Sequence, residues 1–100
     1  MKIDQDQLEM LADIAVEADC SFRSHYSGRG MYGASCPGVV VGSLRDAFRF
    51  MADVRDRDEG LFDDLLDGLS MDSMGFSTIV YFSSVSTESL QQVGGDDDGF

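Results

Sequence analysis

Basic residues are scarce in this chain of 100 residues, where seven Lys and Arg stand against 19 Asp and Glu, for a net charge of −12. A surface with this balance repels phosphate backbones and anionic membranes, and it attracts basic surfaces. We therefore expect no direct contact with nucleic acid, and we expect a basic protein or a nucleic-acid-binding complex as the partner. Acidity that serves only solubility, or adaptation to salt, predicts the same composition.

Long apolar runs are also absent. No stretch approaches the roughly 20 apolar residues that span a bilayer, and the first ten residues, MKIDQDQLEM, hold no apolar segment of the signal-peptide type. We expect a cytoplasmic protein without membrane contact. Cys20 and Cys36 are the only cysteines, and in that compartment they are expected to be reduced thiols.

Residues that carry chemistry lack the spacing that catalysis or metal binding requires. Cys20, His25 and Cys36 offer three zinc ligands, but there is no C-x-x-C pair and no fourth ligand. Ser24 and His25 are neighbours on an expected strand, where successive side chains point to opposite faces. Carboxylates are numerous, but an exposed charged stripe offers no pocket that would separate two pKa values for acid–base catalysis. We expect a protein that is not an enzyme and that holds no metal or cofactor.

The segment 20–42, CSFRSHYSGRGMYGASCPGVVVG, contains both cysteines, the only histidine and the only proline. Alternation over 20–26, turn-forming residues over 27–35 and the Val-Val-Val run predict a β-hairpin. Pro37 cannot donate to a strand ladder, so the second strand is expected to begin there or to lie at a sheet edge. A turn centred on Gly28 would place Cys20 opposite Cys36.

The loop of this hairpin reads GRGMYG over 28–33 and matches G-x-G-x-x-G. A dinucleotide site needs these glycines to open a helix, whereas here a strand follows them. We interpret the glycines as loop residues that supply positive φ angles. Arg29 and Tyr32, at the tip of the loop, are candidate contact residues for a partner.

The first helix is predicted to begin after Asp4, with Asp4 and Gln7 as a capping box. Its apolar stripe consists of Leu8, Leu11, Ile14, Ala15 and Ala18. The opposite side carries what we call the carboxylate stripe, which consists of Asp6, Glu9, Asp13 and Glu17. Like charges at i,i+4 cost about 0.2 to 0.5 kcal/mol per pair, so helix stability alone does not select this arrangement.

Two further helices and one strong strand are predicted after the hairpin. The helix that starts at Ser43 is expected to bury Leu44, Ala47, Phe48, Met51 and Val54, with Phe50 off that stripe. The helix over 61–69 has an apolar side and an acidic side, and with Asp56 it forms a second acidic cluster of Asp56, Asp63, Asp64 and Asp67. Segment 71–75 is predicted as a turn, 76–85 as a central strand and 87–93 as one helical turn.

These predictions together define an α+β fold in the order α-β-β-α-α-β, with a small, mainly antiparallel sheet of about three strands. Residues 1–93 are expected to form one compact domain. Residues 94–100, GGDDDGF, are expected to form a flexible acidic tail.

Two resemblances bear on function. The tail residues Asp96, Asp97, Asp98 and Phe100 resemble the tip of bacterial and phage single-stranded DNA-binding proteins, which implies binding to basic, apolar pockets; Gly99 departs from that pattern. The carboxylate stripe, the acidic residues over 53–72 and the small size resemble those of phage-encoded inhibitors, including anti-CRISPR proteins and other DNA mimics. The second resemblance implies an inhibitor that acts in a host cytoplasm, with carboxylates in the place of phosphates.

Three functions are compatible with the sequence. The leading hypothesis is a non-enzymatic acidic binding protein whose carboxylate stripe and second acidic cluster pair with Lys and Arg of a nucleic-acid-binding partner. The alternative is a self-assembling structural or accessory protein, such as a homodimer, with an interface made by Phe50, Met31, Tyr32 and the Val39 to Val41 edge. The third is a small-ligand or enzyme role at the glycine loop and His25.

Overall fold

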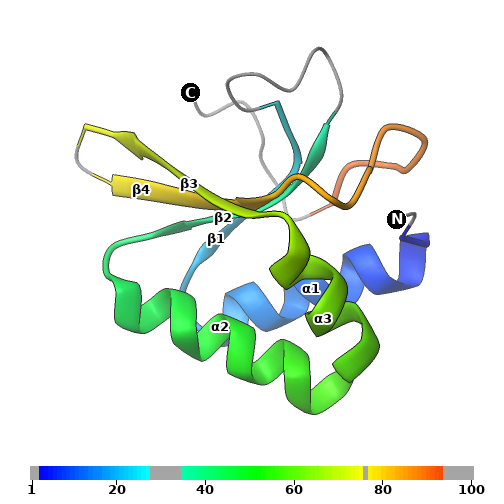
Figure 1. Ribbon diagram of the computed structural model, residues 1–100, viewed down its shortest axis with the longest axis horizontal. Coiled ribbons are helices and arrows are strands. Elements are labelled where there is room, and N and C mark those ends of the chain that lie inside the picture. Colours follow the sequence, from blue (N-terminus) through cyan, green and yellow to red (C-terminus); the bar gives the residue numbers. More distant parts are fainter. Residues whose placement is uncertain (1–2, 28–34, 76, 94–100) are drawn as a thin grey trace.

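The computed structural model describes residues 3–27, 35–75 and 77–93. Three helices cover one face of a four-stranded sheet in an α+β fold (Figure 1). In chain order the elements are α1 (Gln5–Glu17), β1 (Ser21–Tyr26), β2 (Cys36–Val41), α2 (Leu44–Arg57), α3 (Glu59–Asp67), β3 (Leu69–Met74) and β4 (Ser77–Phe82). The strand order in the sheet is β1-β2-β4-β3, and all neighbouring strands are antiparallel.

The predicted fold class and antiparallel sheet are confirmed, but the prediction of about three strands is wrong. The additional strand is β3, which the sequence analysis divided between a helix end and a turn. Its sequence, LSMDSM, has weak strand propensity, but all six of its residues pair with β4, from Leu69 opposite Phe82 to Met74 opposite Ser77. Partner pairing therefore overrides local propensity here. The helix α3 ends at Asp67, and Gly68, its C-cap, lies so close to the backbone of Ser84 that a side chain would not fit.

The predicted hairpin is present as β1 and β2, but its register differs. Tyr26, not Cys20, lies opposite Cys36, so the predicted Cys20–Cys36 pair is wrong. The strand β2 begins at Cys36 and lies inside the sheet, which excludes the edge position for Pro37. The register shifts opposite Pro37, where Ser24 and His25 together face one residue. Such a bulge lies where the proline cannot donate to the ladder.

The ends of α1 follow local rules. Asp4 accepts a hydrogen bond from the Gln7 backbone N at 2.7 Å, and the Gln7 side chain accepts one from the Asp4 backbone N at 3.1 Å, which confirms the capping box. At the other end, Asp19 adopts the left-handed region with a φ of 63°. The Cys20 N–H reaches the Ala15 carbonyl at 2.8 Å, which is the Schellman arrangement that usually has glycine at the left-handed position.

The helix α2 buries three of the five residues predicted for its core stripe, and Phe50 takes the place of the other two. Phe50 is fully buried, and its ring stacks on Phe82 of β4 with centroids 6.3 Å apart. Leu44 and Phe48, expected in the core, are 55% and 71% exposed. The buried residues of α2 are Ala47, Phe50, Met51 and Val54, which also follow helical spacing. The helix carries two overlapping apolar stripes, and the packing against the sheet selects one of them.

The C-terminal segment contains no helix in its described part, so the helical turn predicted over 87–93 is wrong. Thr87 is fully buried; its hydroxyl donates to the Ser24 carbonyl at 2.7 Å, and its N–H donates to the Ser35 carbonyl at 3.0 Å. These bonds hold the segment against the β1–β2 hairpin, and the Leu90 N–H donates to the Thr87 carbonyl at 3.1 Å to close a single turn. The strand β4 is confirmed as a buried central strand, with Ile79 to Phe82 all buried.

Candidate functional site

The carboxylate stripe lies on the solvent side of α1. Leu8, Leu11 and Ile14 are fully buried on one side of the helix. The acids follow one another at steps of three and four residues, and with a helical period of 3.6 residues this spacing places them all on the other side. All four acids are exposed: Asp6, Glu9, Asp13 and Glu17. The amphipathic pattern of α1 therefore both anchors the helix and presents a row of carboxylates to solvent.

One member of the stripe is partly neutralised by a residue that is distant in sequence. The Arg57 Nη2 atom donates to both carboxylate oxygens of Glu17, at 2.9 and 3.0 Å. Arg57 is the last residue of α2, and the contact joins the C-terminal ends of α1 and α2. Within residues 3–27, 35–75 and 77–93, no ion pair involves Asp6, Glu9 or Asp13. These three carboxylates form the part of the stripe that remains available to a partner.

The second acidic cluster is divided between α2 and α3. Asp56, Asp63 and Asp67 are exposed, whereas Asp64 is half-buried. The helix α2 packs against both α1 and α3, and its exposed positions include three cations: Arg45, Arg49 and Arg55. The surface of α2 therefore carries positive charge as well as Asp56, and the start of α3 lies beside α1, where the Gln7 side chain donates to the Asp58 carboxylate at 3.3 Å.

His25 is held by hydrogen bonds at both ring nitrogens. Its Nε2 atom lies 2.9 Å from the Leu90 carbonyl, and its Nδ1 atom lies 3.1 Å from the Ser24 hydroxyl. A carbonyl oxygen only accepts, so Nε2 carries the proton. The Ser24 hydroxyl also accepts from the Val93 N–H at 3.1 Å and is 2% exposed. The prediction that Ser24 and His25 point to opposite faces is wrong, because the bulge at Pro37 brings them together.

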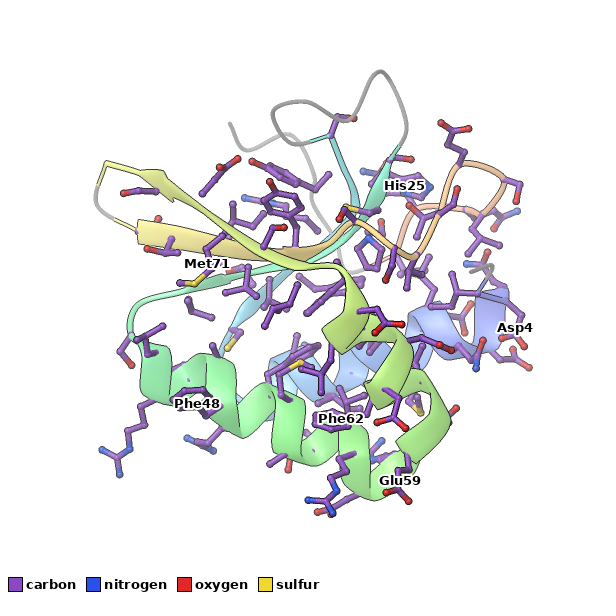
Figure 2. All side chains as sticks on the ribbon, viewed as in Figure 1. Asp4, His25, Phe48, Glu59, Phe62 and Met71 are labelled. Carbon is purple, nitrogen blue, oxygen red and sulfur yellow. The ribbon has the colours of Figure 1, made fainter. Side chains whose placement is uncertain are left out.

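The hydrogen bonds of Ser24 and His25 fix the C-terminal segment, residues 90–93, to β1. Ser24 is buried beneath residues 90–93, which denies a substrate access to its hydroxyl. Figure 2 shows His25 close to the turn that this segment makes. Arg29 and Tyr32, the candidate contact residues of the hairpin loop, lie outside the residues that the structure describes.

Both cysteines are thiols outside any disulfide, and their pKa values are raised. Burial is the main cause for each, and it raises the pKa of Cys36 to about 11. The pKa of Cys20 is also raised, by partial burial and then by the charges of Asp46 and Asp19. Because the thiolate is the nucleophile and the metal ligand, neither residue is activated. In the described part of the chain, no cluster of three or more His, Cys, Asp or Glu is placed to hold a metal ion.

The structure has an exposed apolar surface that was not predicted from the sequence, and we call it the apolar patch. It consists of five of the six large apolar side chains that are exposed among the described residues: Leu44, Phe48, Leu66, Leu69 and Met71. Leu44 and Met71 line one hollow of about 210 Å³ between the start of α2 and the sheet. The sequence pattern that could have indicated this patch is the presence of two apolar stripes on α2. When the stripe that contains Phe50 is buried, Leu44 and Phe48 of the other stripe remain exposed.

Comparison of the chain with protein-family models, with curated proteins and with solved structures gave no match. None of the helices in the described ranges is long and apolar enough to cross a membrane.

Proposed function

We propose that this protein is a non-enzymatic acidic binding protein, an inhibitor that presents helix carboxylates to a basic, nucleic-acid-binding partner in the cytoplasm. The observation that carries the proposal is the exposure of the whole carboxylate stripe, in which Asp6, Glu9 and Asp13 form no ion pair among the described residues. An unpaired row of like charges on one helix works against the stability of that helix. Cations of a basic partner would neutralise these carboxylates, so binding would remove the free-energy cost of their mutual repulsion.

The mechanism is occupation of sites that phosphates would otherwise fill. A rise of 1.5 Å per residue places successive carboxylates of the stripe about 4.5 to 6 Å apart along the helix axis. Each can accept charge-assisted hydrogen bonds from Lys or Arg. The stripe would therefore compete with nucleic acid for a row of cations, and binding would weaken as salt screens the charges.

The residues of the second acidic cluster have a secondary place in this proposal. Asp56, Asp63, Asp64 and Asp67 would add contacts for a partner that covers α3 and the end of α2 as well as α1. Arg45 and Arg49 are exposed on the first half of α2, where they would repel a basic surface. Arg29 and Tyr32 remain candidate contacts by their position in the hairpin loop.

The test is capture of basic nucleic-acid-binding proteins from a lysate by the immobilised chain, followed by elution in a salt gradient. The double variant E9K/D13K reverses the centre of the stripe, and E59K/E88K changes the net charge equally at two exposed positions elsewhere. We expect a captured complex that DNA displaces, that E9K/D13K loses and that E59K/E88K retains. Equal loss in both variants would show that net charge alone is responsible and would contradict the proposal.

The alternative, self-assembly, cannot use the interface that the sequence suggested. Phe50 is fully buried, and Val39 to Val41 belong to β2, which lies inside the sheet and not at its edge. Met31 and Tyr32 lie outside the described residues. The observation that favours self-assembly is a different one, the apolar patch.

A further inference from the structure

The apolar patch draws its residues from α2, from β3 and from the end of α3. Leu44 and Met71 line the same hollow, and Phe48 lies one helical turn after Leu44 on the same flank of α2. Leu69 and Met71 are two residues apart on β3, so they point to the same face of the sheet. Leu66 lies one turn before Leu69, at the end of α3. The exposed fractions of these side chains range from 43% for Leu69 to 71% for Phe48.

The patch adjoins a free strand edge. In the described part of the sheet, β3 pairs only with β4, so its other edge is open. Leu69 and Met71 lie opposite Phe82 and Val80, which belong to the core between the sheet and the helices. Their side chains therefore point to the helix side, and Figure 2 shows Met71 there, at the same end of the molecule as Phe48. An open strand edge beside exposed apolar side chains is a template for pairing with another strand.

The charges around the patch form two opposite sets with the same spacing. Phe48 has Arg45 three residues before it and Arg49 one residue after it. Leu66 has Asp63 and Asp67 at the same two offsets. All four charged residues are exposed. Each helix thus presents one apolar residue flanked by two like charges, positive on α2 and negative on α3.

We propose that this surface binds a second copy of the chain, with the two β3 strands antiparallel about a two-fold axis. Such an axis reverses the strand, so the Leu69 end of one copy meets the Met74 end of the other. Leu66 lies next to the Leu69 end, and Leu44 lies toward the other end, where Met71, Ser77 and Thr78 line the hollow with it. The aspartates of α3 in one copy therefore face the arginines of α2 in the second copy.

A second copy fits this surface better than a partner of one charge sign. An isologous interface requires a patch that is complementary to itself, and here each copy supplies both the positive and the negative set. A basic partner would face Arg45 and Arg49, and an acidic partner would face Asp63 and Asp67. The stripe on α1 lies outside the interface, so the dimer would display two stripes, and the proposed function does not depend on it.

The test is sedimentation equilibrium of the full chain over a wide concentration range. The wild type is expected to form a dimer. The variants M71K and F48K place a charge within the apolar contact and are expected to weaken dimerisation at least about tenfold, since 1.4 kcal/mol is tenfold in affinity. The matched control is V16K, because Val16 is the sixth exposed large apolar residue, 74% exposed, and lies on α1. All three positions are exposed, and circular dichroism is used to check that each variant folds.

A charge exchange tests the predicted orientation. We expect R49D and D67R each to weaken the dimer, and the double variant R49D/D67R to restore it by forming the reversed pair across the axis. A wild type that stays monomeric, a dimer that V16K weakens as much as M71K does, or a double variant no better than the singles would each overturn the proposal. The capture experiment with E9K/D13K does not involve these residues, so the two proposals fail separately.

Discussion

The Tyr26 hydroxyl donates a hydrogen bond of 2.9 Å to the carboxylate of Asp72, and so connects β1 with β3 at opposite edges of the sheet. The tyrosine ring lies against Tyr81 of β4, with centroids 5.1 Å apart. Tyr81 packs with Cys36 and Ile79 in a second, smaller cluster on the sheet face away from the helices. The contact therefore ties the four strands together on the face that the helices leave uncovered.

This contact predicts a loss of stability in alkaline solution. Burial, followed by the hydrogen bond to Asp72 and the charge of Asp72, raises the pKa of Tyr26 from 10.0 to about 12. The folded protein favours the neutral phenol, so this contribution is complete below pH 10 and disappears as the pH rises through 12. Tyr26→Phe should lower the free energy of unfolding by about 1 kcal/mol at pH 7 and should show a smaller further loss between pH 10 and 12.

Urea unfolding across this pH range measures the effect. Burial also raises the pKa of Cys36 to about 11, so both proteins are compared in a Cys36→Ala background to remove that overlapping titration. If the free energy of unfolding fell equally between pH 10 and 12 in the Tyr26 protein and in the Tyr26→Phe variant, the loss would come from other groups.

Because α2 buries Phe50 and leaves Phe48 exposed, we expect alanine substitutions at these two positions to have very different effects on the free energy of unfolding. Phe50→Ala removes a fully buried ring that stacks on Phe82 and should cost about 3 to 5 kcal/mol. Phe48→Ala removes a side chain that is 71% exposed and should change the free energy of unfolding by no more than about 0.5 kcal/mol. Chemical denaturation of both variants provides the comparison, at a low protein concentration chosen to keep the proposed dimer dissociated. A larger cost at Phe48 would mean that α2 packs with its other stripe inward.

The left-handed conformation of Asp19 predicts a stabilising substitution. Glycine adopts a positive φ without steric cost, and a carboxylate at the C-terminal end of a helix is unfavourable to the helix dipole. Asp19→Gly should therefore raise the free energy of unfolding by about 0.5 to 1 kcal/mol. Asp19→Ala is the matched control, because it removes the same charge but cannot relax the backbone, and it should be less stable than the glycine variant. Thermal denaturation compares the stabilities of the two variants. A glycine variant that is no more stable than the alanine variant would show that the positive φ of Asp19 does not cost stability.

The two thiols differ in burial, so we expect them to react with a thiol reagent at different rates, Cys20 slowly and Cys36 much more slowly. Cys36 is fully buried and Cys20 is half-buried. Both pKa values are raised, so the thiolate fraction is small at pH 7 and grows as the pH rises toward each pKa. We expect Cys20 to react first, Cys36 to react only on unfolding, and both to react at once in denaturant. Cys20→Ser should remove the faster phase. A fast phase that survives in this variant would show that Cys36 is accessible.

The amino-acid sequence by itself determined the features that depend on near neighbours. The capping box of Asp4 and Gln7, the start of α2 at Ser43 and the central strand β4 follow from hydrogen bonds or apolar patterns within a few residues. The exposure of the carboxylate stripe follows in the same way from the amphipathic pattern of α1. The candidate site on α1 could therefore be predicted without knowledge of the rest of the fold.

The tertiary structure alone decided which surfaces meet. The choice between Phe48 and Phe50, the extension of β3 along β4 and the pairing of Arg57 with Glu17, 40 residues away, depend on contacts between distant segments. The helix α2, for example, has two overlapping apolar stripes, and its own sequence is compatible with burial of either one. A local pattern cannot choose between them, because the free energy that does so comes from burial against an element elsewhere in the chain.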